Sequence, residues 1–170
     1  MEITIHRGAN QIGGCITEIS TEGCKVFIDF GSNLPGVSKS EFSKEQVEAL
    51  TSGADAVFYT HYHGDHVGLH HLVPKGVPQY IGGGAKEVML LKYKALRQPE
   101  NYGFVSKMSV YSPSRGIDVG GKGLITVTPY FIDHSAFDAY MFKIECEGRA
   151  ILHTGDFRRP GYLGKALLRM

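Results

Sequence analysis

Short apolar runs separated by glycines are the feature of this sequence that most restricts its fold. The chain has 170 residues, and 22 of them are glycine, many of which lie between apolar segments. Glycine adopts the backbone angles that tight turns need, so this spacing favours a sheet-rich fold with short connections. An apolar share of 42% and a charged share of 21% are ordinary for a globular protein with a core of its own.

Alternating apolar residues, and runs rich in β-branched and aromatic residues, predict several strands. They are expected at residues 2–7, 15–21, 25–30, 55–60, 124–132, 139–145 and 150–153. Glu22-Gly23 is a hairpin signal, which suggests an antiparallel start to the sheet. Pro129 predicts a bend or an edge position, because proline cannot donate to a strand ladder.

Two helices are also expected. Ser43 followed by Gln46 makes a capping box ahead of a short amphipathic run. Residues 85–97 predict a longer helix, in which Val88, Leu91 and Leu96 are apolar positions among charged ones.

This order of elements indicates an α/β fold. Strands come first, then helices interleaved with strands, then strands again, as in a sandwich with helices outside packed sheets. There is no internal repeat, low-complexity tract or linker, so we expect one domain over residues 1–170.

Composition excludes some classes of protein. The net charge is +1 without a cluster of lysines or arginines, so bulk charge does not announce a nucleic-acid partner, although a local groove can still be basic. No stretch approaches the ~20 apolar residues of a membrane span, and the N-terminus lacks the pattern of a secretory signal. The cysteines Cys15, Cys24 and Cys146 have no CxxC spacing, so we interpret them as buried thiols. We therefore expect a cytoplasmic protein with no membrane partner.

Three histidines and an aspartate lie within six residues, directly after an apolar run. At the end of a strand, residues i and i+2 point the same way, so His61 and His63 can grip one ion together. Gly64 permits a sharp change of direction, after which Asp65 and His66 begin a helix and reach a second position. A single histidine is more often structural, but this spacing is hard to obtain by chance. It predicts a metal site, with zinc favoured and iron or manganese as alternatives.

Other strand ends carry residues of the same type. His134 follows the run at 124–132, and Asp156 comes just after the run at 150–153. Asp29 ends another strand, where a carboxylate is well suited to hold a ligand histidine by its second nitrogen. Ligands gathered from distant strand ends are how a sheet scaffold assembles a rigid site.

The HxHxDH motif, with a strand-end aspartate before it and a lone histidine and a Gly-Asp pair after it, resembles the metallo-β-lactamase superfamily. The DHS and TGDFR sequences at 133–135 and 154–158, and the opening GANQIGG, are most similar to its ribonuclease J-like, β-CASP branch of nucleic-acid hydrolases. The resemblance implies an αββα sandwich that binds two divalent ions. One ion would be held by His61, His63 and His134, and the other by Asp65 and His66, with Asp156 bridging both.

The resemblance also implies hydrolysis of a phosphodiester by a metal-bridged hydroxide. Asp65 or Asp156 would orient the attacking oxygen, and Ser135 and Arg158 would contact the substrate. Supporting positions around the ligands are assigned to Asp29, Asp133 and His153, the last of which can also simply pack. Tyr62 is expected to pack, His70 and His71 are expected to be solvated or packed rather than ligands, and Arg159 is as easily a surface residue as a phosphate contact. Two alternatives remain: a hydrolase of small esters, thioesters or lactones, and a non-catalytic metal-binding fragment.

The sequence departs from the family pattern after Asp156. A final ligand histidine normally lies further downstream, and the β-CASP insertion is missing, while residues 161–170 look like the beginning of a helix. We therefore expect the N-terminal portion of a longer protein, with a sandwich incomplete at its C-terminus and a second metal site that is weak or empty. An incomplete sandwich leaves a strand edge or apolar surface uncovered, so we expect a homo-oligomer.

Overall fold

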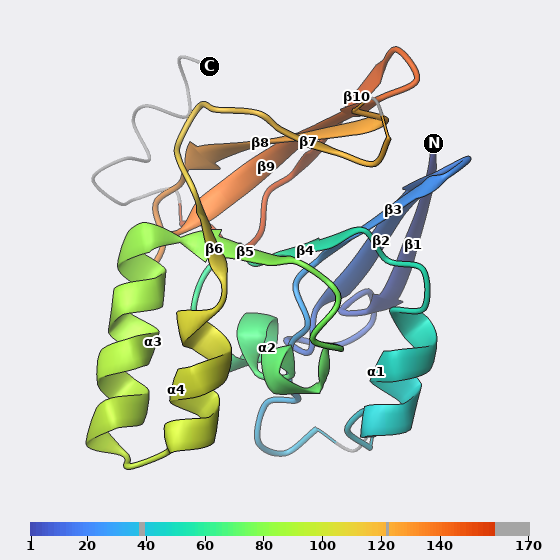
Figure 1. Ribbon diagram of the computed structural model, residues 1–170. Helices are drawn as coiled ribbons and strands as arrows, with labels where there is room; N and C mark the ends of the chain where they lie inside the picture. The colour runs from blue at the N-terminus through green and yellow to red at the C-terminus, as the bar shows by residue number, and fades with distance from the viewer. Residues whose placement is uncertain (38–39, 122, 159–170) are drawn as a thin grey trace.

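Two β-sheets pack face to face, and the α-helices lie on the outer side of the first sheet (Figure 1). In the computed structural model of the chain, the described residues are 1–37, 40–121 and 123–158. Within them no helix covers the outer face of the second sheet (Figure 1). The expected α/β sandwich is therefore confirmed, with three of its four layers among the described residues.

The first sheet has six strands in sequence order. They are β1 (Glu2–Arg7), β2 (Ile16–Thr21), β3 (Cys24–Ile28), β4 (Ala56–Phe58), β5 (Gln79–Gly82) and β6 (Ser109–Tyr111). The first three are antiparallel, as predicted, and Thr21 pairs with Cys24 across a hairpin in which Gly23 has φ of +84°. From β3 to β6 the strands are parallel.

The second sheet is antiparallel and has four strands in the order β10-β9-β8-β7. They are β7 (Ile117–Val119), β8 (Ile125–Phe131), β9 (Tyr140–Cys146) and β10 (Arg149–His153). Pro129 lies in β8, but β7 pairs with β8 only as far as Val127. Pro129 is therefore past the end of β7, at a local edge where its missing N–H leaves no gap in that ladder.

The helices are α1 (Lys44–Leu50), α2 (Gly64–Val67), α3 (Gly83–Ala95) and α4 (Pro99–Ser106), with a 3₁₀ turn at His70–Leu72. The capping box predicted at Ser43 is present. Of the apolar residues named for this helix, Val88 is half-buried, but Leu91 and Leu96 are 68% and 55% exposed. The buried residues of α3 are Ala85 and Met89, which lie one helical turn apart. Among the described residues, no helix has both the length and the apolarity to cross a membrane.

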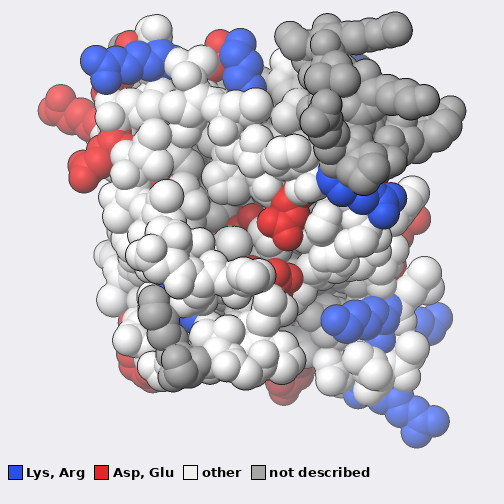
Figure 2. Space-filling view, turned by 180° about the vertical axis from the view of Figure 1, so that it is seen from behind, with Lys and Arg blue, Asp and Glu red and all other residues white. Residues whose placement is uncertain are grey.

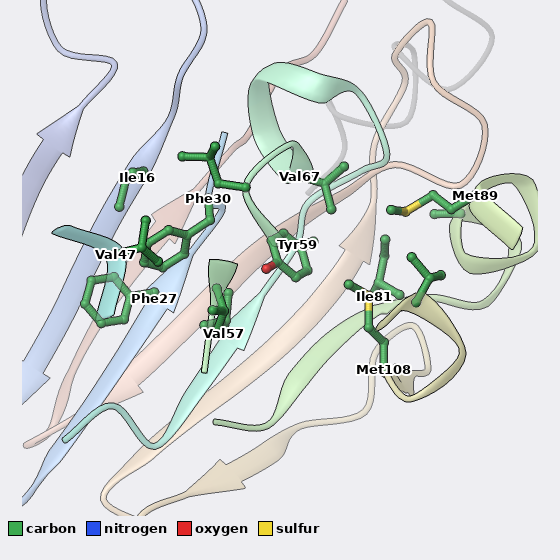
Figure 3. Packing of buried hydrophobic residues seen from close by; sticks show 14 residues of the cluster. Ile16, Phe27, Phe30, Val47, Val57, Tyr59, Val67, Ile81, Met89 and Met108 are labelled. Carbon is green, nitrogen blue, oxygen red and sulfur yellow. The ribbon is translucent and has the colours of Figure 1, made fainter. Parts of the chain in front are cut away.

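The first sheet is buried on both faces. Phe27, Val57 and Tyr59 pack toward the helices (Figure 3), whereas Ile28 and Phe58 pack toward the second sheet. Burying a side chain of this size contributes about 1.5 to 3 kcal/mol. The short strand β4 is consequently a rigid support, and the residues at its C-terminal end are held in place.

Candidate metal centre

The loop from β4 to α2 carries two of the predicted ligand histidines. His61 is buried, His63 is half-buried, and their ring centroids are 4.7 Å apart. His63 is the N-cap of α2, so the chain changes direction at Gly64, as the sequence predicted. Asp65 and His66 then occupy the first turn of that helix.

His134 joins this pair from the loop after β8. Its Nε2 atom lies 3.2 Å from Nδ1 of His63, and its ring centroid is 4.7 Å from that of His61. One ring nitrogen from each of the three histidines lies within 4.8 Å of the others. The fold therefore gathers the trio that the sequence assigned to one ion from two distant segments.

Asp156 lies between this trio and His66. Its Oδ2 atom is 3.5 Å from Nε2 of His66 and 4.0 Å from Nε2 of His134. Asp65 Oδ2 is 3.8 Å from the same nitrogen of His66. A second group of mutually close donors comprises His61, His66 and Asp156. The position of Asp156 suits a bridge, while His61 belongs to both groups, which the sequence did not predict.

A buried network orients two of these histidines. Asp29 accepts a hydrogen bond from the Thr60 amide at 2.8 Å and contacts Nδ1 of His66 at 2.7 Å. The Thr60 hydroxyl lies 2.9 Å from Asp29 Oδ2 and 3.0 Å from Nδ1 of His61. If Thr60 donates to Asp29, it accepts from Nδ1–H of His61, which leaves Nε2 of that neutral ring bare. The contact of His66 Nδ1 with Asp29 likewise turns the Nε2 atom of His66 away from the network.

The two Nε2 atoms are the clearest sign that the site suits a metal ion. In His61 and His66 they are buried and have no hydrogen-bond partner among the described residues. Leaving a buried polar atom unpaired costs about 1 to 3 kcal/mol. A divalent cation at this place would satisfy both nitrogens, and imidazole with carboxylate is a donor set that suits zinc. The residues present therefore fit a metal ion.

Burial and neighbouring charges set the protonation of this network. Burial, assisted by His66, lowers the pKa of His61 to about 3, so its ring is neutral and its lone pair is available. Burial also opposes the charge on His66, but the Asp29 carboxylate raises the pKa of that ring to about 9. Despite the effect of burial, His66 holds the pKa of Asp29 below its usual range, so Asp29 stays ionised.

Two glycines allow the chain to pack closely against the start of α2. A Cβ at Gly31 would overlap the carbonyl oxygen of Asp65, and one at Gly13 would lie 2.8 Å from Asp65 Cβ. The Cys15 amide donates to the Asp65 carbonyl at 3.0 Å, and the Phe30 amide donates to that of His66 at 2.8 Å. The opening glycine-rich segment therefore packs directly against the candidate site.

Of the three cysteines, Cys24 and Cys146 are buried as expected, but Cys15 is half-exposed.

The loop of Asp156 is tied to the loop of His134. Arg158 donates from Nε to Asp133 Oδ1 at 2.7 Å and from its backbone amide to the Asp133 carbonyl at 2.8 Å. Nδ1 of His153 accepts from the Gly155 amide at 3.3 Å, and among the described residues His153 is outside both groups of close donors.

Ser135 and Arg158 are exposed and line a hollow of about 590 Å³ together with His134. Figure 2, which views the molecule from behind, shows acidic side chains near the middle of that face and basic ones toward its margins. Arg159 and residues 161–170 lie outside the described residues.

Thr60 was missed by sequence reasoning. It is fully buried and is the only hydroxyl seen to join Asp29 to both His61 and His66 among the described residues. The signal was available: Thr60 is the polar end of an apolar run and directly precedes the first histidine. Tyr62 packs, as expected, but its hydroxyl also accepts a hydrogen bond from the Phe137 amide at 3.2 Å.

The sequence profile of the metallo-beta-lactamase superfamily matches residues 16–168. Among solved structures, a protein of unknown function from Enterococcus faecalis V583 has 23% identity and a TM-score of 0.77, over 98% of this chain and 46% of that one. MEM-A1, a subclass B3 metallo-beta-lactamase from a soil metagenome library, has 16% identity and a TM-score of 0.55, over 92% and 67%. Zn(2+)-bound PqqB from Methylobacterium extorquens has 13% identity and a TM-score of 0.58, over 90% and 56%.

These likenesses concern the fold. The chain spans slightly less than half of the length of the E. faecalis protein. The matches do not resolve the ribonuclease J-like branch that the motifs resemble, because the structures named above carry other descriptions.

Proposed function

The chain belongs to the metallo-β-lactamase superfamily, whose members are generally metal-dependent hydrolases, and we propose that it hydrolyses phosphodiester bonds of nucleic acid as part of its intact protein. The observation that carries the proposal is that two buried Nε2 atoms, those of His61 and His66, lie in one group of close donors with Asp156 and have no hydrogen-bond partner among the described residues. The choice of phosphodiester rests on the DHS and TGDFR sequences, which resemble the ribonuclease J-like, β-CASP branch.

The proposed ligands of the first ion are the first group of close donors, and those of the second ion are His66 and Asp156 of the second group together with Asp65, which lies 3.8 Å from His66. One divalent ion would be held by His61, His63 and His134, and a second by Asp65 and His66, with Asp156 between them. We propose zinc for both, on the chemistry of the donor set. When bound, such ions would make a water more acidic and neutralise charge that develops on the attacked phosphorus.

The side chains of the protein position the reactants. Asp29 holds His66 at Nδ1, so that ring cannot rotate away from the site. Asp65 or Asp156 would accept a hydrogen bond from the attacking oxygen and orient its lone pair toward phosphorus. Ser135 and Arg158 line the adjoining hollow and would contact a phosphate oxygen.

A second candidate is a hydrolase of small esters, thioesters or lactones. It is favoured by the wall of the hollow, where Phe131, Ile132, Ala136 and Phe137 are apolar, and by the net charge of only +1. An apolar pocket with a few polar groups is typical of small-molecule sites.

Metal analysis and paired assays test the proposal. Protein purified without added metal is analysed for its elements, then assayed on single-stranded RNA, on an aryl phosphodiester and on a thioester. The His63→Ala variant should lose metal-dependent phosphodiester hydrolysis. The His71→Ala variant, which alters an exposed histidine outside the candidate site, should keep it. A metal-dependent phosphodiesterase rate equal in His63→Ala and the unmodified chain would refute the assignment, and turnover of the thioester alone would favour the second candidate.

A further inference from the structure

Phe137 is an exposed aromatic residue beside the candidate metal centre. Its side chain is 67% exposed, and it lies in the loop between β8 and β9 that also carries His134. Both residues line the hollow of about 590 Å³. Unpaired bases and other flat rings stack on aromatic side chains, so an accessible phenylalanine beside the site is suited to receive one.

The backbone around Phe137 is held rigidly. Its amide donates to the hydroxyl of Tyr62, the residue between His61 and His63. The next residue, Asp138, accepts hydrogen bonds from the Ala85 amide at 3.0 Å and from the Tyr140 hydroxyl at 2.7 Å. The loop is therefore anchored to the candidate metal centre on one side and to the first turn of α3 on the other.

The ring of Phe137 lies close against Gly84. A Cβ at Gly84 would lie 2.6 Å from Cε1 of Phe137, too close for a real contact. The ring therefore contacts the first turn of α3, while most of the side chain stays open to solvent. An aromatic ring that is exposed but already positioned loses little conformational entropy when a flat group stacks on it.

A cation faces the same hollow. Arg158 lines it, and the bond to Asp133 uses Nε of its guanidinium group. A guanidinium group has further donors at its two terminal nitrogens, which suit a phosphate oxygen. The hollow therefore combines an aromatic platform, an arginine and a residue of the candidate metal centre.

We infer that Phe137 is a stacking platform for one unpaired base of a single-stranded nucleic acid, next to the phosphodiester that reaches the metal centre. The inference rests on the proposed function, since it adds the form of the substrate to the reaction. Stacking on an aromatic side chain needs a base whose face is free, which a single strand offers and an intact duplex does not.

Binding measurements on the zinc-loaded 170-residue chain separate the contribution of base stacking from that of the phosphate contacts. The probes are a fluorescently labelled single-stranded oligonucleotide and an abasic strand of the same length, measured by anisotropy. Phe137→Ala should weaken binding of the base-containing strand by about 5- to 150-fold, the range found when a stacking side chain is removed. Binding of the abasic strand should stay the same, and Phe137→Trp should restore the affinity for bases. Leu91→Ala, which removes an apolar side chain of similar exposure on α3, is the matched control and should change neither.

Two results would overturn the inference: unchanged binding of the base-containing strand in Phe137→Ala, or equal weakening of both strands. A change in oligomeric state in Phe137→Ala with unchanged oligonucleotide binding would likewise overturn it, in favour of a protein contact. The proposed function fails separately, since that failure is an absence of metal-dependent turnover, whatever the effect of Phe137 on binding.

Discussion

Replacing Asp29 with asparagine should weaken zinc binding without unfolding the protein. Asp29 is fully buried, has φ of +63°, and contacts the Thr60 amide and Nδ1 of His66. Asparagine has nearly the same shape and is among the few residues that tolerate a positive φ, so Asp29→Asn changes the hydrogen bonding with little added backbone strain.

The expected loss of zinc affinity follows from the side-chain NH₂ group of asparagine, a hydrogen-bond donor that aspartate lacks. Its single carbonyl oxygen can keep the bond from the Thr60 amide, which leaves the NH₂ group facing Nδ1 of His66. That group would donate to Nδ1 and leave the proton of the neutral ring on Nε2, the atom that faces Asp156. Loss of such an orienting partner typically costs 10- to 100-fold in metal affinity, or about 1.4 to 2.7 kcal/mol.

A chelator competition at neutral pH measures the zinc affinity of Asp29→Asn and that of the unmodified chain. Asp55→Asn is the matched control, because the Asp55 carboxylate also accepts a backbone amide bond, from Lys25 at 2.8 Å, but lies outside the site. The reasoning is refuted if folded Asp29→Asn binds zinc as tightly as the unmodified chain and Asp55→Asn do.

Three further changes test the packing and the pH dependence. Phe58→Ala should lower the free energy of unfolding by about 3 to 5 kcal/mol in urea titrations, because Phe58 is fully buried between the sheets. Gly31→Ala should lower it by about 1 to 3 kcal/mol, because the new Cβ would overlap the Asp65 carbonyl, whereas Gly76→Ala, which meets nothing, should be neutral. Burial lowers the pKa of His70 to about 4, so the stability that depends on its neutral ring is complete above pH ~6.5 and is lost as the pH falls toward 4. Between these pH values the free energy of unfolding of His70→Leu should therefore fall by up to about 3 kcal/mol less than that of the unmodified chain.

The parts of the fold that the sequence predicted are those with strong local patterns. Strand β1 matches its predicted bounds, and β4 follows from an apolar run because parallel strands buried on both faces have that composition. The strands β5, β6 and β7 were missed, since each is short and shows no alternation. The helix α4 was missed as well, because its pattern of polar and apolar residues is weak.

In the candidate site, too, the sequence predicted the residues that belong to a motif and missed those that only the fold brings close. His61, His63 and His66 are close in sequence, so their spacing alone predicts that they converge. Thr60 and Phe137 carry no motif, and their positions depend on contacts that link distant segments: Thr60 with Asp29, and Phe137 with Tyr62. Such contacts follow from the order of strands in the first sheet and from the packing of the two sheets, which no local pattern encodes. Spacing therefore predicts donors within one loop, whereas the groups that aim those donors, or that would receive a substrate beside them, are found only once the chain has folded.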